Sequence, residues 1–291
     1  MLGIVTGLKS EAQLLRGLDL ICISTGGRGH IARAKIERLA ERGITGLVSF
    51  GIAGALSPEL RAGDIVIAGK SISEGGEMWT AHQPWIDALL WSVAQPRSNG
   101  HRDDVPHHAA ARRSEGHAGS MPTWSADRED ASMPPHTPPV TPALGRGPSE
   151  RQTPAAPWIP AQGRDDRRGG VRVGTILGMD RLLSSPQEKA DAFARTGALA
   201  ADMESHHVAR AAAEHGLPFI AIRAISDDVN EALPAIMASF VDTEGRTKMS
   251  AVLAALILGR VSIGELLQAG RASKRAHQAL LRCRGALAGL R

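Results

Sequence analysis

Residues 200–205 read Ala-Ala-Asp-Met-Glu-Ser, and residues 219–228 read Phe-Ile-Ala-Ile-Arg-Ala-Ile-Ser-Asp-Asp. Each stretch is a short apolar run that ends in carboxylates, which is the pattern of a buried strand followed by polar residues. In a mostly parallel sheet, such residues lie at the carboxyl ends of the strands, where ligands bind. Taken singly, Asp202 and Glu204 are typical of helix N-caps, and Asp227 is typical of a cap or a turn.

Strands and helices alternate on both sides of these stretches. Short apolar runs predict strands, and apolar residues at helical spacing, followed by glycine or proline, predict helices. The predicted strands span residues 2–5, 18–24, 46–52, 64–68, 171–177, 198–201 and 219–225, and the predicted helices span 31–42, 204–215 and 248–258. This alternation predicts a three-layer α/β fold, with a mostly parallel or mixed central sheet flanked by helices.

A proline-rich segment interrupts the pattern. Residues 92–170 hold twelve of the seventeen prolines and five of the eleven histidines, with few aliphatic residues and no lysine. Such a segment cannot offset the entropy of its own ordering, and its histidines reflect composition rather than a metal site. We expect one domain from residues 1–91 and 171–261, a disordered insertion over 92–170, and a basic helical tail over 262–291.

Composition limits the class of protein. Cys22 and Cys283 have no metal-site or framework spacing, so we expect neither disulfides nor structural zinc, and a reducing compartment fits. The chain starts directly in an apolar strand, and its longest apolar run, 251–258, is too short to span a membrane. We therefore expect a cytoplasmic protein. The net charge of +4 comes from scattered arginines without a recognition module, so no nucleic-acid partner is expected.

Two glycine-rich stretches follow predicted strands. Gly27-Arg28-Gly29-His30-Ile31-Ala32 matches the dinucleotide fingerprint, with helix N-terminal amides that can hold a phosphate. The next strand ends without the carboxylate that would bind ribose, so we do not expect NAD. Gly51-Ile52-Ala53-Gly54 predicts a tight turn of small residues, at which backbone amides approach a ligand closely.

Four motifs in register point to one family. They are Gly51-Ile52-Ala53-Gly54, Gly63-Asp64-Ile65-Val66, Asp202-Met203-Glu204-Ser205 and Ile225-Ser226-Asp227. In this order they resemble the nucleoside phosphorylase superfamily, which includes methylthioadenosine/S-adenosylhomocysteine nucleosidase. The resemblance covers residues 1–91 and 171–245. It implies a nucleoside phosphorylase-like fold, a homodimer, and an enzyme that cleaves the N-glycosidic bond of an adenine nucleoside to release adenine.

The resemblance also implies three catalytic carboxylates. Asp227 would protonate or hydrogen-bond N7 of adenine, which suits general acid catalysis if the pocket or the bound base raises its pKa. Glu204 would hold the ribose hydroxyls, and its charge would favour the oxocarbenium-like transition state. Glu11 would position the attacking water, although its residue pattern also fits the first polar turn of a helix.

Further residues are expected to contact the substrate. Met203 would pack on the ribose, Ala53 and Gly54 would line the site, and Ser226 belongs to the motif of the catalytic acid. Arg28 offers the charge that a phosphate requires. Ile52 stands where relatives often carry a hydroxyl, so water and phosphate both remain candidate nucleophiles. Apart from phosphate as co-substrate, we expect no cofactor and no metal.

Within the superfamily, the chain looks most like the hopanoid-associated phosphorylases, on residues 178–181, 198–206 and the tail around 266–279. This implies adenosylhopane, a lipid-linked nucleoside, as substrate. The tail 262–291 carries six Lys or Arg against one acid, so it fits either an interfacial helix on the inner face of the membrane or a terminal helix packed on the domain. The alternative function is a non-catalytic nucleoside-binding or scaffold protein, inactivated by the insertion.

Overall fold

A computed structural model describes residues 1–26, 29–94, 169–233, 246–258 and 261–290. These residues belong to one compact unit, formed from residues 1–97 and 154–291, and the fold below is the fold of that unit. The insertion expected over 92–170 lies outside the described residues except at its two ends. Arg28 also lies outside them.

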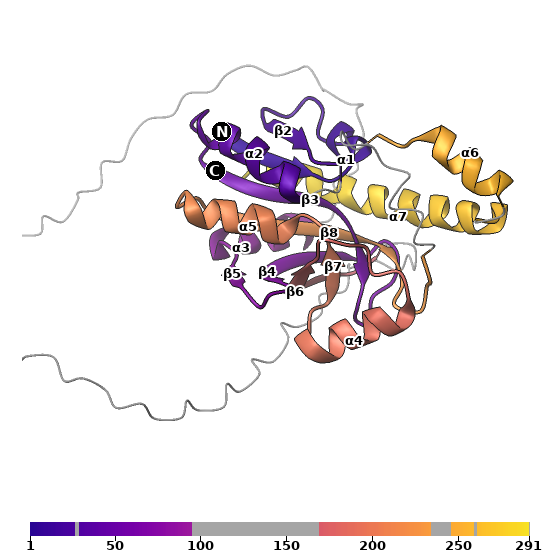
Figure 1. The fold of residues 1–291 in the computed structure, drawn as a ribbon. Helices are drawn as coiled ribbons and strands as arrows, with labels where there is room; N and C mark the ends of the chain where they lie inside the picture. The colour runs from indigo at the N-terminus through magenta and orange to yellow at the C-terminus, as the bar shows by residue number, and fades with distance from the viewer. Residues whose placement is uncertain (27–28, 95–168, 234–245, 259–260, 291) are drawn as a thin grey trace, which may run out of the picture. The chain divides into compact units, whose positions relative to one another are not determined.

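An eight-stranded mixed sheet forms the centre of the unit (Figure 1). Its order is β2-β1-β3-β7-β6-β4-β5, and β8 pairs with both β3 and β4. The strands are β1 (Leu2–Thr6), β2 (Ile21–Ser24), β3 (Gly46–Ala55), β4 (Ile65–Ser73), β5 (Met78–Thr80), β6 (Val171–Gly178), β7 (Ala200–Asp202) and β8 (Phe219–Asp227). Five of the pairings are parallel and three, β3–β7, β4–β5 and β4–β8, are antiparallel. The predicted mixed sheet is confirmed.

The pairings of five strands close into a ring, which runs β3-β8-β4-β6-β7 and back to β3. At the point of closure, Gly54 of β3 pairs with Asp227 of β8 on one side and with Ala201 of β7 on the other. The ends of β7 and β8, which carry the carboxylates of the two motifs, therefore meet at one strand.

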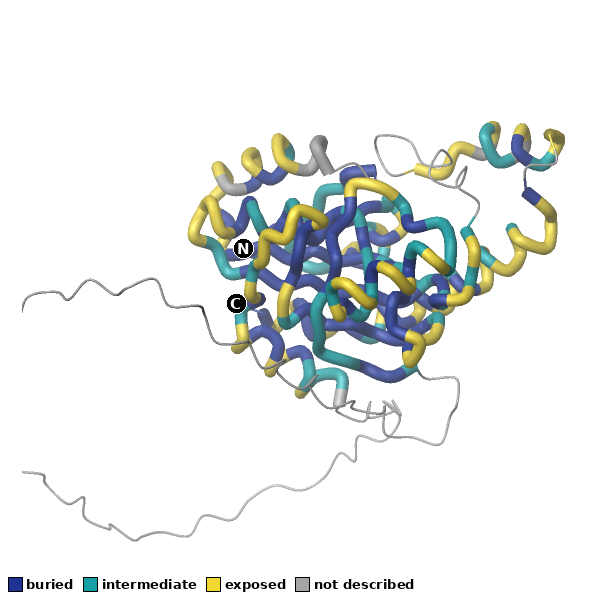
Figure 2. The backbone as a smooth tube through the Cα atoms, turned by 60° about the horizontal axis from the view of Figure 1, so that its bottom comes forward, coloured by how far each residue is buried: buried dark blue, intermediate teal, exposed yellow. Residues whose placement is uncertain are grey.

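Helices flank the sheet, as the sequence predicts. They are α1 (Lys9–Gln13), α2 (Gly29–Ala40), α3 (Gln83–Ala94), α4 (Pro186–Thr196), α5 (Ser205–Glu214), α6 (Met249–Ile257) and α7 (Ile263–Leu287). Helix α5 packs on α2 and on β3, β6 and β8, whereas α7 packs on α3, β8 and β3. The buried residues concentrate in the strands, and the exposed residues lie largely on the helices and the connecting loops (Figure 2).

The C-terminal segment packs on the domain. Helix α7 begins with a capping box between Ser262 and Glu265, and its later turns bury alanine, leucine and Cys283 against the sheet. Its first turns leave Ile263 and Leu267 exposed. From Ala272 onward the tail is therefore a terminal helix packed on the domain, which is one of its two interpretations, whereas its first turns are not packed in this way. Among the described residues, no helix is long and apolar enough to cross a membrane.

One local prediction is wrong. Residues 51–54 do not form a turn, because β3 continues through them to Ala55 with a register shift between Ala53 and Gly54. The two glycines of this stretch let carboxylate side chains pack closely against the strand.

Candidate active site

A cavity of about 330 Å³ lies where β3, β7 and β8 end. Its wall also includes Glu11 of α1, residues 181–183 between β6 and α4, and Ala269 and Ser273 of α7. The volume is at the lower end of the range for small-molecule sites. Every described residue that the sequence proposes for the site lines this cavity: Glu11, Ala53, Gly54, Met203, Glu204, Ser226 and Asp227.

Asp227, the last residue of β8, has a donor at each carboxylate oxygen. Lys189 Nζ donates to Oδ2 at 2.6 Å, and the Ser226 hydroxyl donates to Oδ1 at 2.7 Å. The ammonium group of Lys189 also donates to the carbonyls of Asp228 and Glu231, each at 2.9 Å. The side chains of Lys189 and Asp227 are 2% and 8% exposed, so this ion pair is shielded from solvent. A buried charge pair that is also hydrogen-bonded fixes the position of the carboxylate.

Glu204 lies between β7 and α5 and is almost fully buried. It occupies the N-cap position of α5 without making a capping bond, because Asp202 accepts the backbone amide of Ser205 at 3.0 Å instead. Burial raises the pKa of Glu204 to about 8, the negative charge of Asp202 adds to the rise, and Arg223 opposes it. This raised pKa brings the loss of the Glu204 proton towards the pH range in which an acid–base catalyst works.

Glu11 is held by backbone amides from two elements. Its Oε2 accepts the amide of Leu8 at 2.8 Å, and its Oε1 accepts the amide of Ile52 at 2.9 Å. Burial raises the pKa of Glu11, while the two amides and Arg223 act in the opposite direction. The bond to Ile52 fastens the short helix α1 to β3.

Arg223 of β8 places a buried positive charge next to Asp202 and near Glu204. Its Nε donates to Asp202 Oδ2 at 2.5 Å, Nη2 donates to Ser49 at 2.5 Å, and Nη2 lies 3.9 Å from Glu204 Oε2. Its side chain is 1% exposed, so the positive charge acts through a medium that screens it weakly. No role for Arg223 was predicted from the sequence. An arginine inside an apolar strand does indicate a buried ion pair, because arginine is rarely buried without a partner of opposite charge.

Lys189 was also missed. It lies on α4, in the first turn after the capping box of Ser185 and Glu188, where a lysine normally faces solvent. Nothing in the local sequence links it to Asp227, 38 residues further along the chain.

Each of the three carboxylates lies over a glycine. A Cβ atom on Gly7 would come within 2.7 Å of Glu204 Oε1, and one on Gly51 within 2.7 Å of Glu11 Oε1. A Cβ on Gly54 would come within 2.8 Å of Asp227 Oδ2. Real Cβ atoms do not approach so closely, so these positions admit the carboxylates only because they lack a side chain. This is the physical reason for the glycines in the motif of β3.

The chain belongs to the phosphorylase superfamily, whose family model matches residues 13–258. The expectation of an enzyme of the nucleoside phosphorylase and nucleosidase class is thereby confirmed. A search among curated protein sequences gives no match.

Solved structures share the fold. The methylthioadenosine/S-adenosylhomocysteine nucleosidase of Streptococcus pneumoniae, solved with a transition-state inhibitor, is 16% identical, with a TM-score of 0.53 over 98% of this chain and 99% of that one. The corresponding enzyme of Colwellia psychrerythraea, solved with adenine, is 14% identical, with a TM-score of 0.54 over 98% and 95%. The futalosine hydrolase of Helicobacter pylori is 12% identical, with a TM-score of 0.51 over 88% and 97%.

Proposed function

We propose that this protein cleaves the N-glycosidic bond of an adenine nucleoside and releases adenine. The observation that carries the proposal is the convergence of Glu11, Glu204 and Asp227 from three elements into one cavity of nucleoside size. Membership of the phosphorylase superfamily and the solved nucleosidases of the same fold support it.

In this proposal, Asp227 acts on the leaving group. As the bond between C1′ and the purine breaks, the electron pair moves onto the base, and N7 takes a proton that passes from the ammonium group of Lys189 through the carboxylate of Asp227. Lys189 Nζ, 2.6 Å from Oδ2, is left as a neutral amine. Ser226 orients the other oxygen.

Glu204 and Glu11 act on the sugar and the nucleophile. Glu204 binds the ribose hydroxyls beside Met203, and its ionised form stabilises the positive charge that develops on the sugar ring. The raised pKa of Glu11 suits a general base, so Glu11 takes a proton from the water that attacks C1′. We propose water as the nucleophile and no cofactor. Phosphate, held by Arg28, is the alternative co-substrate.

The 5′ side of the substrate is proposed to be apolar. The described wall carries Leu8, Ile52, Leu56, Leu182, Leu183, Met203 and Leu233. Such a wall suits the hydrocarbon substituent of adenosylhopane, most of which must project from a cavity of about 330 Å³.

The junction of α6 and α7 exposes four large apolar side chains. Each is more than half exposed: Ile257, Leu258, Ile263 and Leu267. We propose that they touch the membrane surface from the cytoplasmic side, next to the basic residues of α7.

A homodimer completes the proposal. Trp91 of α3 is 70% exposed, and large exposed aromatic side chains are enriched at protein interfaces. Light scattering after gel filtration measures the mass, and a Trp91→Ser variant should dissociate if this surface is the interface.

The deciding experiment is an assay of adenine release with and without phosphate, on methylthioadenosine, adenosine and adenosylhopane. Release without phosphate, with free sugar as product, supports hydrolysis, whereas a sugar phosphate identifies phosphate as the nucleophile. A folded protein that leaves all three uncut but binds adenine is the non-catalytic nucleoside-binding alternative. Restored activity on deletion of residues 93–169 would then assign the loss to the insertion.

A further inference from the structure

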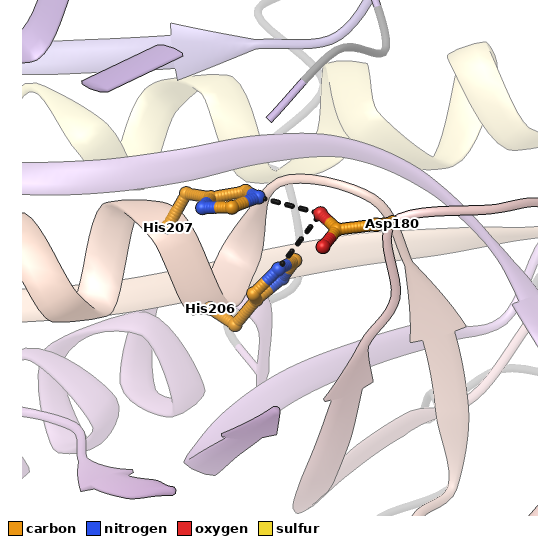
Figure 3. Close-up of side chains that lie close together, drawn as sticks. All are labelled: Asp180, His206 and His207. Carbon is orange, nitrogen blue, oxygen red and sulfur yellow. Dashed lines mark hydrogen bonds and ion pairs between the residues drawn. The ribbon is translucent and has the colours of Figure 1, made fainter. Parts of the chain in front are cut away.

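Three potential metal ligands meet at the rim of the domain, outside the cavity. Asp180 lies in the segment after β6, and His206 and His207 are consecutive residues in the first turn of α5 (Figure 3). One ligand atom from each residue lies within 4.8 Å of the other two. We propose that Asp180, His206 and His207 bind a divalent transition-metal ion of the Zn²⁺ class.

The distances fit a shared ion. Both imidazoles direct Nε2 at the same oxygen, Asp180 Oδ1, at 3.4 Å from His206 and 2.8 Å from His207. Two atoms bound at about 2.1 Å to one tetrahedral ion are about 3.4 Å apart. The His206 pair already has this separation, and the His207 pair reaches it if the carboxylate moves by about 0.6 Å. Asp180 is 74% exposed, so its side chain is free to move that far.

The chemistry of the three ligands indicates the kind of ion. The two imidazole rings lie beside each other, with centroids 3.8 Å apart and a tilt of 40° between their planes. Two nitrogens and one carboxylate oxygen favour Zn²⁺, Co²⁺ or Ni²⁺ over Mg²⁺ or Ca²⁺.

Two features indicate an exchangeable ion rather than a permanent one. The three protein ligands leave the solvent side of the ion open, because Asp180 is exposed. His206 Nδ1 is buried without a hydrogen-bond partner among the described residues. The hydrogen bond that usually fixes the ring of a metal-binding histidine through its other nitrogen is therefore missing.

An ion at this position would tie two parts of the cavity wall together. Asp180 immediately precedes Arg181, which lines the cavity with Leu182 and Leu183, and His206 comes two residues after Glu204. The expected consequence is a lower KM for the nucleoside when the metal is bound. This consequence alone rests on the proposed function.

The spacing explains why the sequence did not predict the site. Asp180 precedes His206 by 26 residues and belongs to a different element, so no metal-binding pattern exists along the chain. The pairing of β6 with β7 brings the two segments together, since Gly178 lies beside Asp202.

The test is metal binding by the full chain after removal of metals with a chelator. Co²⁺ is the probe, read by its visible absorption and by titration calorimetry, and Zn²⁺ should displace it. The variants are Asp180→Asn, at an exposed position that does not endanger folding, and His207→Gln. The matched control is His215→Gln, an exposed histidine at the end of the same helix.

The proposal expects one Co²⁺ that binds the wild type and the control equally, and at least about tenfold more weakly in both variants. Equal binding by all four proteins overturns it, because the ion then binds elsewhere, for example at the histidines of residues 101–136. Absence of Co²⁺ binding to the wild type overturns it as well. Neither readout depends on nucleoside cleavage.

Discussion

Lys189 Nζ lies 2.6 Å from Asp227 Oδ2, and both side chains are buried. In a low-dielectric environment, a lone charge of either sign is costly, so removal of one partner leaves an unfavourable buried charge on the other. The pair therefore combines two properties that are separable by mutation. It stabilises the fold near the cavity, and it holds a proton within reach of a bound base.

Asp227→Asn is expected to lower adenine release by about 10²- to 10⁴-fold, because an amide cannot deliver a proton. The amide also leaves Lys189 as an unpaired buried charge, which should lower the free energy of unfolding by about 3–5 kcal/mol. Initial rates and urea denaturation measure the two effects. Asp191→Asn, on the exposed side of the same helix as Lys189, is the control and should change neither.

A double variant separates stability from chemistry. Lys189→Met combined with Asp227→Asn removes both charges, so it should recover most of the stability that either single change loses. The rate should stay as low as in Asp227→Asn. Recovery of the rate in the double variant would show that Asp227 has only a structural role.

Gly54→Ala tests the close packing between β3 and the proposed acid. The new Cβ would come within 2.8 Å of Asp227 Oδ2, so the carboxylate must shift away from Lys189 or from the cavity. A displacement of about 1 Å can cost about 100-fold in rate, and we expect a loss approaching this size. Measurement of kcat and of adenine affinity separates misplaced chemistry from a blocked site.

Gly270→Ala is the matched control for that change. Gly270 lies in α7, and a Cβ there meets no atom within 4 Å. The rate should be unchanged, and the helix should gain about 0.5–1 kcal/mol. If Gly54→Ala behaved like Gly270→Ala, the packing of Asp227 on β3 would be irrelevant to activity.

Much of the fold could be predicted from the sequence, because apolar runs of strand length mark most of the strands of the sheet. The runs at 46–52, 171–177 and 219–225 all lie in strands, and the carboxylates that follow the runs at 198–201 and 219–225 line one cavity. The electrostatic support of these carboxylates was not predictable in the same way. Lys189 reaches Asp227 across 38 residues, and the glycines of β3 looked like a turn, because the sequence shows their small size but not what packs on them.

Glu204 should make stability depend on pH. Its pKa of about 8 in the folded protein lies above its ordinary value of 4.5, so between these values the folded chain holds a proton that the unfolded chain releases. The free energy of unfolding should therefore fall as the pH rises through this window, by up to about 1.4 kcal/mol per pH unit. Glu11, whose pKa is also raised, acts in the same direction.

Urea denaturation between pH 5 and pH 8.5 measures this dependence. Glu204→Gln should flatten the profile and leave the protein more stable than the wild type at pH 8. Glu41→Gln, at an exposed position, should keep the wild-type slope. Identical slopes in all three proteins would mean that Glu204 is ionised throughout the window.

Glu11→Gln tests the proposed general base. Both oxygens of Glu11 accept backbone amides, from Leu8 and Ile52, and glutamine offers only one acceptor oxygen. One amide then faces the side-chain NH₂ group, which should cost about 1–3 kcal/mol of stability.

Hydrolysis by Glu11→Gln in phosphate-free buffer should fall by about 10²- to 10⁴-fold, because the attacking water loses its base. Affinity for adenine should change little, because the proposed contacts of the base are with Asp227. Gln13→Ala, an exposed change in the same helix, should retain full activity. If phosphate restored the rate of Glu11→Gln with a sugar phosphate as product, the nucleophile would be phosphate, which needs no base to attack C1′ because it is already anionic. Glu11 would then serve to fasten α1 to β3.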